Sequence, residues 1–157
     1  MKEKKKGNRP GIRRVGRTLA FQVLYGQSFV EASDENSLEK AFLDNPAVID
    51  EESAAAIDFA QALVLGVVRE RAAIDAIITD HSQHWKLERI AKVELSILRL
   101  SVYEMTRTDI PLRAAINEAI ELSKTFGDDN SRGFINGILD AVAKAVSRGN
   151  FGVEKQF

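Results

Sequence analysis

Apolar residues recur every three or four positions along most of the chain between residues 12 and 146, which is the repeat of α-helices that each bury one face. The most apolar stretch runs from Leu87 to about Met105, where a second line of apolar residues widens the first. A surface that wide is typical of a central helix with several neighbours. No segment keeps the apolar–polar alternation of a half-buried strand. The sequence therefore predicts an all-α fold.

Three further patterns lie in the N-terminal half. An amphipathic helix is expected from Ile12, with Phe29 still on its apolar side. Residues 33–52 are acidic and less regular, with a short helix expected from Ser37 to Leu43. Residues 51–78 return to a helical repeat, which Gly66 or the group at 69–71 is expected to kink.

Breakers mark the helices of the C-terminal half. Pro111 suits the first turn of a helix, and Gly127 suits the end of the same helix. Asn130 or Ser131 is expected to cap the last helix. Gly137 lies inside that helix, where glycine lowers helix propensity, so it is expected to allow the close approach of another helix.

Length and composition indicate a single globular domain. The 157 residues are 45% hydrophobic and 29% charged, which are ordinary globular proportions. We expect a flexible basic arm at 1–11, one helical domain at 12–148 and a C-terminal tail at 149–157. There is no cysteine, and no apolar run approaches the roughly 20 residues that span a bilayer. A cytoplasmic protein with no membrane role is the expectation.

The near-neutral net charge of −1 hides a strong asymmetry. Residues 1–17 carry eight lysines and arginines against Glu3 alone, a net charge of +7, whereas the rest of the chain has 14 basic and 22 acidic residues. A basic arm on an acidic body fits a polyanionic partner. The alternative is that the arm only keeps the protein in solution.

Nothing in the sequence predicts catalysis. His81 and His84 lie three apart beside Asp80, but a third metal ligand at suitable spacing is missing. A Gly-rich phosphate loop, a nucleophile elbow and a dinucleotide fingerprint are likewise missing. We therefore expect no enzyme activity, no catalytic residue, no metal and no cofactor.

RNA binding has better candidates. Single-stranded RNA requires long cations for its phosphates and planar groups on which its bases stack. The first requirement is met by the cluster Arg9, Arg13, Arg14 and Arg17. Phe134 meets the second if it is exposed, although an isolated Phe in an apolar helix is more often a core residue. Arg99 has the same ambiguity, because an ion pair with a carboxylate of the body would also explain it.

The chain resembles the NusB family. The likeness covers about 80 residues, and two motifs in this order, INEAIEL at 116–122 and FINGILD at 134–140, are its most specific part. The other matching positions are Arg13-Arg14-x-x-Arg17, Gln22-x-Leu24-Tyr25, Trp85, Glu94-x-x-Ile97-Leu98-Arg99, Tyr103-Glu104, Ile110-Pro111, Ala115 and Lys124-x-Phe126-Gly127. The chain departs from the family in its extension at 1–11, in Asn130 where an acidic residue is common, and in Gly133 where a basic one is frequent.

The resemblance implies a compact bundle of about seven helices in two helical subdomains and a non-enzymatic role in transcription antitermination. It implies that the protein pairs with the ribosomal protein NusE, binds the boxA element of nascent ribosomal RNA and acts indirectly on RNA polymerase. The RNA-binding residues are then expected to be Arg9, Arg13, Arg14, Arg17, Arg99, Asn130 and Phe134. Tyr25 and Glu94 match positions in or near the surface that binds NusE.

Two other interpretations stay open at this stage. The same helical fold forms the N-terminal RNA-binding module of some ribosomal RNA methyltransferases, although a cofactor-binding βαβ segment is missing from these residues. A purely structural protein that forms a homodimer through its apolar helices is the second alternative.

Overall fold

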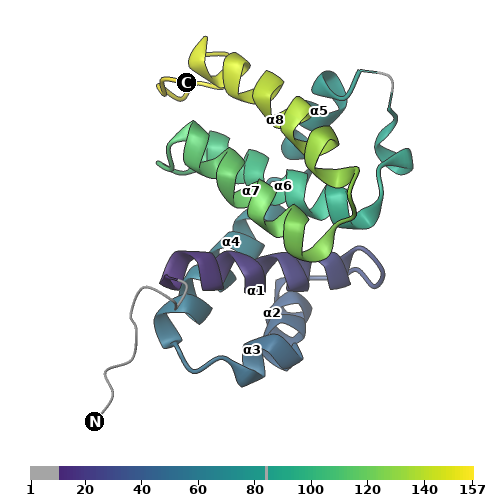
Figure 1. Ribbon diagram of the computed structural model, residues 1–157. Coiled ribbons are helices and arrows are strands. Elements are labelled where there is room, and N and C mark those ends of the chain that lie inside the picture. The colour runs from purple at the N-terminus through teal and green to yellow at the C-terminus, as the bar shows by residue number, and fades with distance from the viewer. Residues whose placement is uncertain (1–10, 84) are drawn as a thin grey trace.

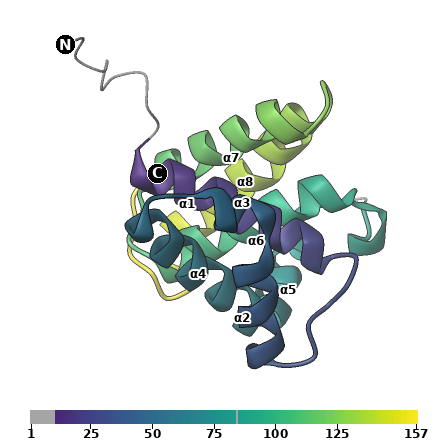
Figure 2. The same cartoon turned by 90° about the horizontal axis from the view of Figure 1, so that it is seen from below.

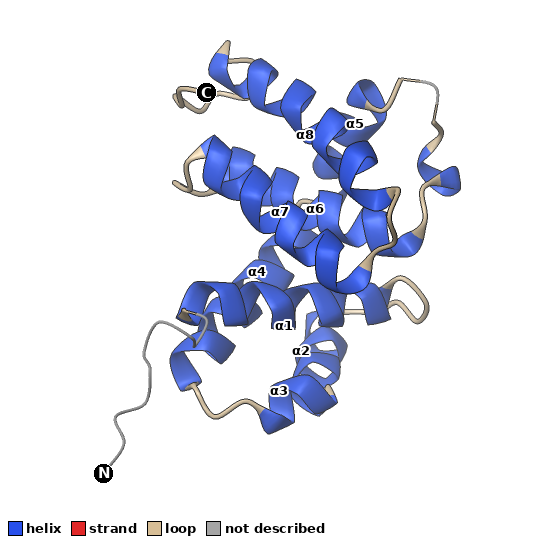
Figure 3. Cartoon of the chain, viewed as in Figure 1, coloured by secondary structure: helices blue, strands red, loops and turns tan. Residues whose placement is uncertain are grey.

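The computed structural model describes residues 11–83 and 85–157, and the helical arrangement of this part of the chain is shown in Figures 1 and 3. The described residues form eight α-helices, one 3-10 turn at Leu87–Arg89 and no strand, which confirms the all-α prediction. The helices are α1 (Ile12–Gln27), α2 (Glu35–Asp44), α3 (Pro46–Asp50), α4 (Ala54–Arg69), α5 (Arg71–His81), α6 (Lys92–Arg107), α7 (Leu112–Phe126) and α8 (Ser131–Ser147). Arg9 and the rest of the expected arm, apart from residue 11, lie outside the described residues.

Local side-chain caps explain why the acidic stretch at 33–52 holds two helices where one was expected. The Asp34 carboxylate accepts a hydrogen bond from the backbone N–H of Ser37 and starts α2. Asn45 ends α2 and caps α3, whose first residue is Pro46, a residue well suited to the first position of a helix. Ser53 caps α4 in the same way.

Two expected helix boundaries need correction. The central helix α6 begins at Lys92 rather than Leu87, because the residues before it form the 3-10 turn and an extended link. Helix α1 ends at Gln27, so Phe29 lies beyond it and is exposed rather than part of its buried face. The expected kink in the group at 69–71 is confirmed, because the pattern at 51–78 is two helices with Glu70 as the junction between α4 and α5.

The helices form two packed groups, as the resemblance implies. Helices α1 to α4 make one group and α5 to α8 the other, as two views at right angles show (Figures 1 and 2). Helix α6 packs against α1 and α4 of the first group and against α5, α7 and α8 of the second. It is therefore the central helix that its wide apolar surface predicts, with Ile97, Leu98 and Met105 fully buried along it.

Two glycines set the closest helix approaches around α1, α4 and α6. A Cβ on Gly16 of α1 would collide with the Phe59 side chain of α4, and one on Gly66 of α4 would collide with the Tyr103 ring of α6. The expected close approach at Gly137 is wrong, because Gly137 is exposed and a Cβ there would meet open space. Gly137 therefore lies within α8 although no neighbouring helix requires a glycine there.

Residues 149–157 fold back onto the body. Phe151 and Phe157 pack against the core, and the Arg113 guanidinium lies 5.1 Å from the centroid of the Phe157 ring. The Lys155 ammonium donates a hydrogen bond of 3.3 Å to the Glu104 carbonyl. Across the described chain, every helix is too short or too polar to span a membrane.

Candidate nucleic-acid interface

The arginines of α1 lie in its first turns, and the helix contains no acidic residue that would offset their positive charge. Arg13 and Arg14 lie in the first turn, where the positive end of the helix dipole disfavours cations. The N-cap is Gly11, which supplies no side-chain acceptor. Arg17 follows one turn later. The positive charge concentrated at this end requires counter-charges, either from the protein or from a bound anion.

Arg17 finds its counter-charge inside the protein. Its Nε lies 2.9 and 3.0 Å from the two carboxylate oxygens of Glu104 on α6, and its Nη2 lies 2.8 Å from Oε2. Both side chains are almost wholly buried, at 8% and 4% exposure. The guanidinium also lies 5.4 Å from the centroid of the Phe59 ring on α4. Arg17 thus ties α1 to both α4 and α6.

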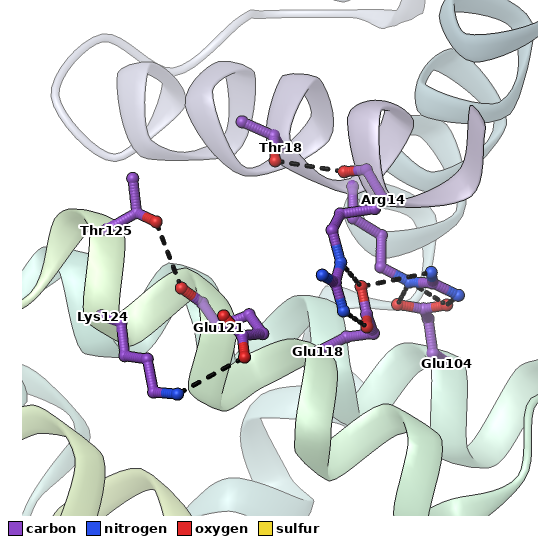
Figure 4. A network of polar contacts seen from close by, with 8 residues as sticks. Arg14, Thr18, Glu104, Glu118, Glu121, Lys124 and Thr125 are labelled. Carbon is purple, nitrogen blue, oxygen red and sulfur yellow. Dashed lines mark hydrogen bonds and ion pairs between the residues drawn. The ribbon is translucent and has the colours of Figure 1, made fainter. Parts of the chain in front are cut away.

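Arg14 makes a comparable pair at the surface with Glu118 of α7 (Figure 4). Its Nε and Nη2 lie 3.2 and 2.7 Å from the two Glu118 carboxylate oxygens. The hydrogen bond and the charge of Glu118 raise the pKa of Arg14 above its ordinary value. Glu118 is also 3.7 Å from Nη1 of Arg17, so one carboxylate serves two arginines.

A small hollow opens between α1 and α7 beside these pairs. Its walls are formed by Arg14, Arg17, Thr18, Glu118, Glu121, Leu122 and Thr125. Glu118 in the hollow pairs with both arginines, and Arg17 also pairs with the buried Glu104, so the positive charge of these two arginines is already neutralised within the protein. Arg13 is different: it is exposed, lies 5.8 Å from the Phe59 ring centroid and has no ion pair among the described residues.

Arg99 lies away from α1 and makes the ion pair that the sequence left as its alternative explanation. Its Nε and Nη2 lie 2.7 and 2.9 Å from the two carboxylate oxygens of Asp75 on α5. Both side chains are mostly buried, and Asp75 is also 3.8 Å from Arg71. The pair holds α6 against α5.

The start of α8 carries the other two residues expected to meet RNA. Asn130 is the exposed N-cap residue, but its side chain makes no capping bond. The Asp128 carboxylate caps the helix instead, accepting hydrogen bonds from the N–H groups of Asn130 and Ser131 at 2.9 and 3.1 Å. Phe134 is half-buried and packs edge-to-face with Trp85, with ring centroids 6.1 Å apart.

The two residues expected to bind a protein partner lie near the end of α1 and at the start of α6. Tyr25 is half-buried near the end of α1 and packs edge-to-face against Phe29, with ring centroids 5.0 Å apart. The Lys92 ammonium lies 5.3 Å from the same Phe29 ring. Glu94 lies in the first turn of α6 together with Lys92. Phe29 therefore contacts both Tyr25 and the turn that carries Glu94.

Sequence reasoning missed the carboxylates that hold the arginines. Glu104 was not recognised as a partner of Arg17, although it shares a helical face with Ile97 and Leu100, and an acid on a buried face requires a cation. Glu118 is expected from the sequence to lie with Glu121 on a solvated helix face, whereas the structure pairs it with Arg14 and Arg17. Across the described residues there is also no cluster of three or more potential metal ligands, and His84 lies outside them.

Two groups of helices around a central one, with an arginine-bearing first helix packed against that central helix, define a small all-helical binding domain. Residues 14–144 match the NusB family. A transcription antitermination protein NusB from Oleidesulfovibrio alaskensis is 53% identical over 92% of this chain and 94% of its own length, and one from Geobacter sulfurreducens is 44% identical over 87% of this chain and 96% of its own length. The chain belongs to the NusB family.

Solved structures agree with this assignment. A NusB of T. maritima is 35% identical and superposes with a TM-score of 0.72 over 84% of this chain and 90% of that one. A second neighbour is a crystal structure of antitermination factors NusB and NusE in complex with dsRNA, which is 29% identical with a TM-score of 0.72 over 85% of this chain and 97% of that one.

Proposed function

We propose that this protein is an RNA-binding transcription antitermination factor that works with NusE on the boxA element of nascent ribosomal RNA. The observation that carries the proposal is the match of almost the whole chain to proteins named as antitermination factors, together with a structural neighbour bound to NusE and RNA. The protein acts by binding rather than by catalysis, and it influences RNA polymerase indirectly. Its place of action is the cytoplasm.

The contacts of the arginines divide their roles. Arg13 is exposed and available for phosphate, with Arg9 adding charge nearby in sequence. Arg14 binds phosphate by exchanging Glu118 for it, since a guanidinium holds either anion through two parallel hydrogen bonds. Arg17 and Arg99 are held by buried carboxylates, so they act on RNA mainly by fixing α1 and α6 in place.

The remaining predicted residues form two further parts of the proposed binding surface. Asn130 and Phe134, at the start of α8, supply an amide and a ring for unpaired bases. Tyr25, near the end of α1, and Glu94, near the start of α6, contact NusE. The exposed Phe29 beside Tyr25 gives this end an apolar centre, which protein interfaces favour.

RNA binding to a boxA-containing single strand and to a scrambled strand of equal length, each with and without NusE, tests the function. Tighter binding to boxA that NusE strengthens is the expected result. Each phosphate contact should contribute about 0.7 to the slope of log affinity against log salt. Equal weak binding to both strands, unaffected by NusE, would reject the proposal.

Matched variants then test the assigned residues. Arg13→Ala should weaken RNA binding and reduce the salt slope, whereas Arg148→Ala, an exposed arginine at the far end of α8, should change neither. Tyr25→Ala should weaken NusE binding and leave the binding of RNA alone unchanged. Equal effects of the two arginine variants would mean that only overall charge matters.

A further inference from the structure

The link between α5 and α6 exposes an aromatic side chain that the roles above leave unused. Trp85 lies in this link with half of its surface in solvent, at 50% exposure. It is the chain's single tryptophan. An indole presents a large apolar surface together with a polar N–H, which suits it to binding at a surface.

The backbone that carries Trp85 is fixed by local contacts. The backbone N–H of Trp85 donates to the Ser82 carbonyl at 3.2 Å. The Ser82 hydroxyl is buried and lies 2.8 Å from the Trp85 carbonyl, to which it donates. Gln83 makes the reversal between them with a left-handed backbone, at a φ of 51°. The backbone N–H and the carbonyl of Trp85 are therefore both tied to Ser82 by hydrogen bonds.

On its other side the indole meets Phe134 of α8. The two rings are nearly perpendicular, with an interplanar angle of 83° and centroids 6.1 Å apart. This edge-to-face packing joins residues from two separate elements into one aromatic pair. Since Phe134 is half-buried and Trp85 is more exposed, Trp85 offers the larger open surface of the pair.

Exposed cations flank the two rings in sequence. Lys86 and Arg89 follow Trp85, and Arg132 precedes Phe134; all three are exposed and none makes an ion pair with another described residue. Glu88, Asp128 and Asp129 are the exposed carboxylates in the same two segments, and the Asp128 carboxylate is engaged in capping α8. This contrasts with the hollow beside α1, where carboxylates already neutralise the arginines.

We propose that Trp85 and Phe134 form a stacking platform for an unpaired base of single-stranded RNA, with Lys86, Arg89 and Arg132 holding the flanking phosphates. Exposed aromatic rings beside cations that track a backbone are how proteins hold single strands, because every base has a face that stacks. This inference rests on the proposed RNA-binding function and extends it from Phe134 to a second, more exposed ring.

The single tryptophan allows a direct test. Titration of the whole protein with a boxA-containing single strand should quench its fluorescence with the same midpoint as binding followed by the anisotropy of labelled RNA. An abasic strand of equal length and phosphate number should bind more weakly and leave the fluorescence nearly unchanged. Binding by anisotropy without a fluorescence change would overturn the platform while leaving the proposed function intact; failure to bind at all would reject the function itself.

Variants give a second measure. Trp85→Ala should weaken RNA binding by about five- to 150-fold, the range for loss of one stacked base. Trp85→Phe should restore part of the affinity, and Ile49→Ala, at an exposed apolar residue of α3, should have no effect. Equal affinities of all three variants would overturn the proposal. Tryptophan fluorescence that changes with protein concentration but not with RNA would also overturn the proposal. It would show that the indole contacts a second copy of the chain instead.

Discussion

Glu118 holds Arg14 through two hydrogen bonds, of 3.2 and 2.7 Å, in the geometry that an arginine also adopts against a phosphate. The two side chains differ in exposure: that of Arg14 is 52% exposed and that of Glu118 only 17%. The arginine can therefore turn towards solvent while the carboxylate stays at the helix surface. Glu118 occupies the face of Arg14 that the proposed phosphate contact requires, so that contact would have to displace Glu118.

Replacing Glu118 with Gln should accordingly strengthen RNA binding. The loss of a competing ion pair at a partly exposed site corresponds to a gain of about two- to fivefold in affinity. If Arg14 gains a phosphate contact that it lacks in the parent protein, the salt slope should also steepen by about 0.7. Anisotropy titrations at several salt concentrations measure both quantities.

Glu121 provides the control for this variant. It lies on the same helix, three residues on from Glu118, and pairs with Lys124 at 3.4 Å rather than with an arginine. Glu121→Gln removes the same charge, so an equal gain from both variants would attribute the effect to overall charge. The Arg14→Ala, Glu118→Gln double variant should show no gain over Arg14→Ala alone.

The Arg17–Glu104 pair should matter for stability rather than for phosphate binding. Glu104→Ala leaves a buried guanidinium with only Glu118, 3.7 Å away, as a counter-charge. Removing one partner of a buried pair typically costs about 3–5 kcal/mol, whereas Arg14→Ala at the surface should cost about 1 kcal/mol or less. Urea unfolding followed by circular dichroism gives both values. Similar small losses of unfolding free energy in the two variants would show that burial does not make the Arg17–Glu104 pair more stabilising than the Arg14–Glu118 pair.

The fold was largely predictable because helical periodicity is a local property. The wide apolar surface of α6 predicted its central place, and the breakers Pro111 and Gly127 predicted the limits of α7. The five-residue α3 escaped prediction, because a helix this short is set by the Asn45 cap rather than by a repeating pattern.

The site was less predictable because it depends on pairing between distant positions. Arg17 and Glu104 are 87 residues apart, and which of many acids reaches a given arginine depends on how the helices cross. The sequence therefore predicts the cluster of arginines, but it does not predict that carboxylates of the protein neutralise them. The meeting of Trp85 and Phe134 likewise depends on packing of α8 against the α5–α6 link.

Two helical glycines should respond in opposite ways to alanine. Gly66→Ala places a methyl group against the Tyr103 ring and should lower the free energy of unfolding by about 1–3 kcal/mol, as overpacking does. Gly137→Ala meets open space on an exposed helix surface and should raise it by up to about 1 kcal/mol, through better helix propensity. Thermal and urea unfolding of the two variants compare them directly. Destabilisation by Gly137→Ala would reveal a packing role that its surroundings do not show.

The C-terminal tail makes the stability depend on pH through Lys155. Burial lowers the pKa of Lys155 below its usual 10.5, and Asp109 and Glu104 offset only part of that effect. At pH 7 the ammonium is charged in both folded and unfolded chains, so its burial lowers the free energy of unfolding by a constant amount. Between the folded pKa and 10.5 the unfolded chain binds more protons, so this free energy rises with pH.

Lys155→Met keeps the length of the side chain and removes its charge, so this variant should be more stable than the parent protein at pH 7. Its advantage should shrink as the pH rises through the folded pKa and should disappear above 10.5, where the parent lysine is neutral in both states. Urea unfolding of both proteins across this range measures the difference, in which other titrating groups cancel. A difference between Lys155→Met and parent that stays constant with pH would mean that the tail leaves Lys155 hydrated.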